Sequence, residues 1–115
     1  MIVPQTHSPD PKATRSERWL GVIRWLEEYR MAYPPTDLAN AIEASLIYAH
    51  DMLGAANRPP TWASADGCRV VEFFWDLDSY GYVVAVVSGR RGIRHELVDG
   101  GVMLWESVWQ MPDDE

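Results

Sequence analysis

The first half of the chain repeats apolar residues with the period of a helix. Apolar positions recur every three or four residues across 14–33, and a second stripe runs across 36–56. Thr14 and Glu17 have the spacing of a capping box, and Pro34 ends the first helix because proline disfavours helical geometry in the residue before it. The short link predicts an antiparallel helical hairpin. The two predicted stripes are Trp19, Val22, Ile23, Leu26, Tyr29 and Tyr33, and then Leu38, Ala39, Ile42, Leu46, Ala49, Met52, Leu53 and Ala56.

After Pro60 the pattern changes to that of strands. The segments 68–75, 82–88, 93–98 and 102–109 are rich in Val and aromatic residues, and short turns separate them. We therefore predict an α+β fold, in which an N-terminal antiparallel helical hairpin packs on one face of a four-stranded antiparallel meander. The predicted single domain covers residues 14–110. An extended or disordered arm at 1–13 precedes it, and an acidic tail follows at 111–115.

The register of each hairpin decides which residues share a face of the sheet, because side chains alternate across a strand. The simplest turns place these residues opposite one another: Trp75 and Tyr82, Ser88 and Ile93, Asp99 and Val102. One face is then nearly all apolar, and we expect the helices to cover it because few charges need desolvation there. Two helices about 8 to 10 Å apart cover roughly the 19 Å width of four strands, so the second face stays open.

The second face combines large aromatic residues with charges, a composition typical of protein interfaces. We expect it to bind a protein partner or a second copy of the chain. The predicted partner-binding residues are Phe74, Met103, Trp105, Trp109, Arg94 and Glu72. The alternative for this face is that the proline-rich arm or the acidic tail folds over it. The predicted function is a non-enzymatic interaction module, such as an inhibitor, an immunity or antitoxin-like protein, or an accessory subunit.

Charge and composition exclude several other classes. The formal net charge of −7 argues against nucleic-acid binding, because an acidic protein repels phosphate. The one basic cluster, residues 89–92, is interpreted as a solvated turn. The longest apolar run, residues 82–87, is far shorter than the roughly 20 residues of a membrane helix. With no signal sequence and Cys68 as the single cysteine, we expect a cytoplasmic protein.

No residues have the spacing of a catalytic or metal-binding motif, so we expect neither enzymatic activity nor a cofactor. His95 and Glu106 face each other in the expected register and are interpreted as a buried polar pair. Cys68 is expected to be a small buried hydrophobe. One alternative stays open. The chain could be a small-molecule-binding protein or minor enzyme, with a pocket between helices and sheet near His95, Glu106 and Tyr82.

Overall fold

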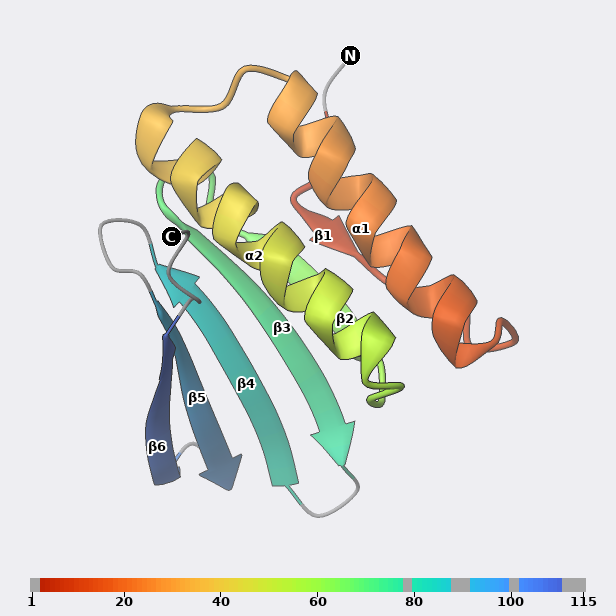
Figure 1. Ribbon diagram of the computed structural model, residues 1–115. Coiled ribbons are helices and arrows are strands. Elements are labelled where there is room, and N and C mark those ends of the chain that lie inside the picture. The colour runs from red at the N-terminus through yellow and green to blue at the C-terminus, as the bar shows by residue number, and fades with distance from the viewer. Residues whose placement is uncertain (1–2, 78–79, 88–91, 100–101, 111–115) are drawn as a thin grey trace.

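A computed structural model of the chain describes residues 3–77, 80–87, 92–99 and 102–110, with side chains described for 3–76 and 83–86. It shows one compact α+β domain with two contacting helices and an antiparallel sheet (Figure 1). The predicted fold class is therefore confirmed. In chain order the elements are β1 Thr6–His7, α1 Arg15–Met31, α2 Thr36–Gly54, β2 Trp62–Ala65, β3 Val70–Leu77, β4 Tyr80–Val87, β5 Gly92–Asp99 and β6 Val102–Gln110.

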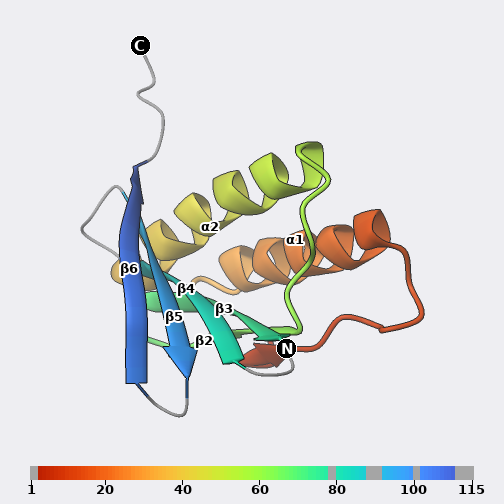
Figure 2. The same cartoon turned by 90° about the horizontal axis from the view of Figure 1, so that it is seen from below.

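In the described part of the chain the sheet has six strands in the order β1-β2-β3-β4-β5-β6, so each strand neighbours the next one in the sequence. Both helices lie on the same side of it, as the second view shows (Figure 2). Helix α2 packs on β3 and β4, and α1 packs on α2. The four expected strands correspond to β3–β6, and β1 and β2 extend the sheet beyond the prediction.

The N-terminal arm contributes β1 to one edge of the sheet. Thr6 pairs with Ser64 of β2. The indole N–H of Trp25 in α1 donates a hydrogen bond to the carbonyl of Pro4 at 2.8 Å, and the ring of His7 stacks on Trp25 with centroids 5.9 Å apart. The described part of the arm therefore lies at the sheet edge beside α1, and it does not fold over the opposite face.

Helix α1 begins as the sequence predicts. The Glu17 backbone N–H donates to Thr14 Oγ1 at 3.1 Å, and the Thr14 hydroxyl donates to Glu17 Oε1 at 3.0 Å, which completes a capping box. The residues of the predicted stripe from Trp19 to Leu26 are buried. Trp25, which the prediction did not include, is buried with them. Tyr33 was predicted in this stripe and is 95% exposed, because the helix has already ended and Tyr33 has a left-handed φ of 55°.

Two tryptophans fix the linker that leads from α2 into the sheet. The Trp19 indole N–H donates to the Asn57 carbonyl at 2.8 Å, and the Trp75 indole N–H donates to the Arg58 carbonyl at 3.0 Å. Their ring centroids lie 6.5 Å apart within the core. Helix, linker and β3 are therefore held together at one point. The sheet side of this core consists of Ala63, Ala65, Val71, Phe73, Trp75, Val84 and Val86.

Two of the three expected pairs are observed, Trp75 with Tyr82 and Asp99 with Val102. The third expectation is wrong, because Ile93 pairs with Val86 and not with Ser88. The difference is two residues. Because the faces of a strand repeat every second residue, this shift leaves the assignment of residues to faces unchanged.

An irregularity between β5 and β6 changes the faces predicted for β6. Val98 pairs with Met103, whereas Leu97 pairs with Trp105, so Leu104 is an extra residue, as in a β-bulge. Since directly paired residues share a face, the register assigns Trp105 to the side of the sheet that carries the helices. Trp109 belongs to that side too, because it pairs with Ile93. The backbone register of β6 therefore differs from the expected one, and the side chains of both tryptophans lie outside the described residues.

Candidate functional site

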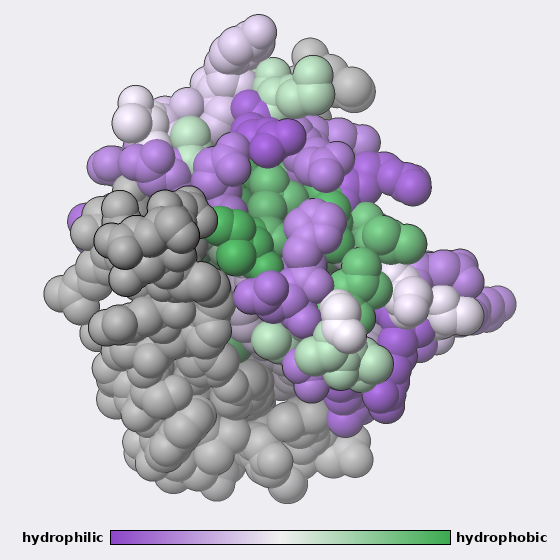
Figure 3. All heavy atoms as spheres, viewed as in Figure 1, coloured by the Kyte–Doolittle hydropathy of each residue, from purple (hydrophilic) through white to green (hydrophobic). Residues whose placement is uncertain are grey.

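The candidate site is the face of the sheet turned away from α1 and α2, which we call the helix-free face. Residues on it alternate with the buried residues of the core. The helix side, by contrast, is covered mainly by hydrophilic residues over the two helices, with hydrophobic residues gathered between them (Figure 3). The described side chains of the helix-free face are Thr6, Trp62, Ser64, Val70, Glu72, Phe74, Asp76, Val83 and Ala85.

An aromatic pair lies on this face. Trp62 of β2 and Phe74 of β3 are direct cross-strand partners, and their rings stack with centroids 4.0 Å apart and an interplanar angle of 18°. Phe74 also pairs with Val83 of β4. Trp62 is 36% exposed, and the other two are half-buried. We call Trp62, Phe74 and Val83 the aromatic patch. It offers apolar surface to a partner without any rearrangement of the fold.

The charges beside the aromatic patch are acidic. Glu72 and Asp76 are exposed and lie on the same face as Phe74, two residues before and after it in β3. The Asp76 backbone N–H donates to the Thr61 hydroxyl at 2.9 Å, which fixes the end of the patch to the linker before β2. Among the described side chains of this face, both ionisable groups are carboxylates. The patch therefore favours a partner that supplies positive charge.

The six predicted partner-binding residues divide between the two sides of the sheet. Phe74 and Glu72 lie on the helix-free face. The backbone register also assigns Arg94 and Met103 to the helix-free face, because Arg94 pairs with Ala85 and Met103 pairs with Val98. The side chains of Arg94, Met103, Trp105 and Trp109 lie outside the described residues, so their part in binding stays a prediction. Trp62 was missed because no strand was predicted before Cys68.

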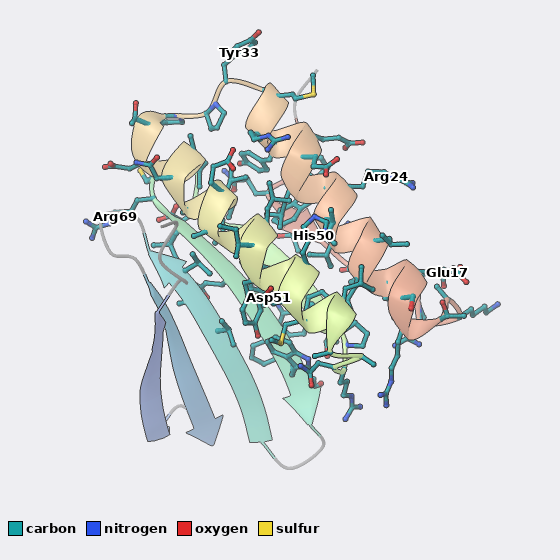
Figure 4. The ribbon with its side chains drawn as sticks, viewed as in Figure 1. Glu17, Arg24, Tyr33, His50, Asp51 and Arg69 are labelled. Atoms are coloured by element: carbon teal, nitrogen blue, oxygen red, sulfur yellow. The ribbon has the colours of Figure 1, made fainter. Side chains whose placement is uncertain are left out.

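The expected burial of Cys68 is wrong. Cys68 is exposed in the turn before β3. The Asp66 carboxylate accepts hydrogen bonds from the backbone N–H groups of Cys68, Arg69 and Val70 at 2.8, 2.9 and 3.0 Å. Burial alone would raise the pKa of Asp66, but these three hydrogen bonds and the Arg69 charge lower it overall. Arg69 points away from the fold at this end of β3 (Figure 4). The side chain of Asp66 thus holds the turn by accepting hydrogen bonds from its backbone.

His7 of β1 is half-buried, with its ring against α1. Its Nε2 atom is buried and has no hydrogen-bond partner. Burial lowers the pKa of His7, although the nearby Glu28 charge opposes this shift. The imidazole is therefore held in its neutral form against Trp25. We interpret it as part of the packing of the arm, because its ring stacks on Trp25.

Where the structure describes it, the core between the helices and the sheet contains aromatic side chains in contact with one another. Tyr48 of α2 lies against Phe73 at a centroid distance of 5.4 Å and against Trp19 at 6.4 Å. The alternative pocket was expected near His95, Glu106 and Tyr82, whose side chains lie outside the described residues. The expected pairing of His95 with Glu106 is wrong, because the extra residue in β6 places His95 opposite Ser107.

Two further features bear on the kind of site. Among the described residues, no group of three or more His, Cys, Asp or Glu side chains could hold a metal ion. No helix in this part of the chain is long and apolar enough to cross a membrane. Comparison with protein-family models, with curated proteins and with solved structures finds no match to this chain.

Proposed function

We propose that this chain is a non-enzymatic interaction module that binds a protein partner through the helix-free face of its sheet. The observation that carries the proposal is the exposed Trp62 stacked on Phe74, with ring centroids 4.0 Å apart, on the helix-free face. Both helices lie on the other side of the sheet (Figure 2). Tryptophan is enriched among the residues that dominate protein binding energies, because it buries a large area with few rotatable bonds.

The chemistry of the face indicates what the partner offers. An apolar side chain of the partner would cover the aromatic patch and exclude water from it. Arginine or lysine residues at the rim would meet Glu72 and Asp76, and the net charge of −7 would attract such a surface over longer distances. A role as an inhibitor, an immunity or antitoxin-like protein, or an accessory subunit fits this chemistry. We place the complex in the cytoplasm.

The test begins with identification of the partner by affinity capture from the native host and mass spectrometry. The purified partner is then titrated against wild-type chain and variants by calorimetry. Trp62→Ala should raise the dissociation constant by roughly 30-fold, which corresponds to a hot spot of about 2 kcal/mol. Glu72→Arg should slow association and reduce its dependence on salt.

The matched control is Leu20→Ala, which removes an exposed apolar side chain from α1 on the other side of the molecule. It should leave the dissociation constant unchanged. Each variant is first checked for native circular dichroism. Unchanged affinity in both Trp62→Ala and Phe74→Ala, with the fold intact, would show that the partner binds elsewhere and would refute the proposal.

A further inference from the structure

The two edges of the sheet differ in length and in protection. Strand β1 has two residues, and its His7 stacks on Trp25 of α1, which also donates a hydrogen bond to Pro4 just before the strand. Strand β6 has nine residues and is the last strand of the described sheet, next to β5. In an antiparallel strand, alternate residues direct their backbone N–H and C=O groups away from the neighbouring strand. The free side of β6 is therefore a template for another strand.

The sequence of β6 has few of the features that usually block such pairing. It contains no proline, glycine or lysine, and Glu106 is its single charged residue. Its extra residue, Leu104, falls near the start of the strand. Beyond it, residues 105–110 pair without interruption with residues 92–97 of β5. The regular part of β6 is thus long enough to add a partner strand.

We propose that β6 pairs antiparallel with β6 of a second copy of the chain, about a two-fold axis through Ser107. Two-fold symmetry requires one residue of an antiparallel pair to face itself, and Ser107 is the centre of residues 105–109. In this register Trp105 faces Trp109 of the second copy, and Trp109 faces Trp105. Glu106 then faces Val108. This register therefore forms two cross-strand tryptophan pairs, and aromatic pairs of this kind stabilise a sheet.

Neighbouring registers are less favourable. An axis through Glu106 would place two carboxylates directly opposite each other, which destabilises a sheet. An axis through Trp105 would extend the pairing across Leu104, where the strand is irregular. An axis through Val108 would place Trp109 opposite Ser107 and lose the aromatic pairs. Self-complementarity about Ser107 is the reason to favour a second copy over a strand of another protein.

The position of the helices is compatible with this pairing. Helix α2 packs on β3 and β4, whereas β5 and β6 lie beyond β4 toward the other edge of the sheet (Figure 1). The register assigns Trp105 and Trp109 to the side of the sheet that carries the helices, beyond the strands on which α2 packs. Since each copy carries a charge of −7, added salt should strengthen the association by screening the repulsion between copies.

Sedimentation velocity of the full chain over a wide concentration range tests the association. We expect a species of twice the 13.1 kDa chain mass. Ser107→Lys places two like charges at the axis and should weaken dimerisation by at least about tenfold. Thr6→Lys adds the same charge at the opposite edge and should leave the dimer intact. A wild-type chain that stays monomeric, or a folded Ser107→Lys variant that still dimerises, overturns the proposal.

Cysteine cross-linking tests the register in a second way, in a Cys68→Ser background that removes the exposed native thiol. Under mild oxidation Ser107→Cys should form a disulfide-linked dimer, because residue 107 faces its own counterpart. Glu106→Cys should not, because it faces Val108. Cross-linking at residue 106 and not at 107 contradicts the proposed axis. Dimerisation abolished by Trp62→Ala would instead assign the self-contact to the helix-free face, which separates this proposal from the proposed function.

Discussion

Replacing Trp19 by phenylalanine tests the junction between α1, the linker and β3. Trp19 is 1% exposed, and its indole N–H donates to the Asn57 carbonyl at 2.8 Å. Phenylalanine keeps an aromatic ring against Tyr48 and Trp75 but removes the donor and the second ring. The variant therefore loses one hydrogen bond and part of the buried apolar area, while the chain keeps the same charge.

The size of the effect follows from these two losses. The loss of this part-buried hydrogen bond costs about 1 to 1.5 kcal/mol. The smaller ring loses roughly another 1 kcal/mol of burial. We expect the free energy of unfolding to fall by about 2 to 2.5 kcal/mol. This is a large share of the 5 to 15 kcal/mol typical of a domain.

Urea denaturation followed by circular dichroism measures this change, and the slope of the transition should stay the same because the exposed area hardly changes. The control is Trp62→Phe, at a side chain 36% exposed, for which we expect a loss below about 1 kcal/mol. If Trp19→Phe destabilises the protein no more than the control, the hydrogen bond to the linker contributes nothing measurable to stability.

Three further changes should alter stability in defined directions. Tyr33→Asn should raise the free energy of unfolding, measured by urea denaturation, by about 0.5 to 1 kcal/mol. The reason is that Tyr33 has a φ of 55°, which asparagine tolerates better. A variant no more stable than wild type would contradict this expectation. Burial lowers the pKa of His7 despite the opposing Glu28 charge, so the unfolded chain binds its proton first. Stability should therefore fall as the pH drops below about 6.5, and His7→Gln should flatten that part of the pH profile. Asp66→Ala should cost about 1 to 2 kcal/mol at neutral pH through the loss of three backbone hydrogen bonds. Those bonds lower the pKa of Asp66 against the opposing effect of burial. The difference in unfolding free energy between wild type and Asp66→Ala should therefore narrow as the pH falls below 3.8. A difference that stays constant with pH would contradict a stabilising role of the ionised carboxylate.

Local signals in the sequence predicted the elements that local interactions form. The capping box of Thr14 and Glu17 set the start of α1, and the pairing of Trp75 with Tyr82 followed from a short turn. Strand β2 has only four residues, with two alanines and a serine, and carries no clear strand pattern. It exists because it pairs with β3. The prolines at 59–60 and the Asp66-Gly67 pair bound this segment in the sequence, but neither identifies the residues between them as a strand.

The candidate site was predicted in part, for a physical reason. Phe74 and Glu72 were placed correctly because the register of β3 and β4 is regular. The register expected for β6 differs from the observed one because one extra residue at Leu104 shifts the pairing of the strand beyond it. Leu104 is an ordinary apolar residue in a run of strand formers, so nothing in its identity marks a bulge.

The order of strands in the sheet has a consequence for how the chain folds. From β2 to β6 each strand pairs with the next one along the chain, so these contacts close short loops and should form early. Strand β1 is different, because both helices lie between it and β2. Its pairing must close a long loop at a larger entropic cost. We expect the amide protons of β1 to exchange with solvent well before those of β3 and β4, which makes the first strand the last to join the sheet and the first to leave it.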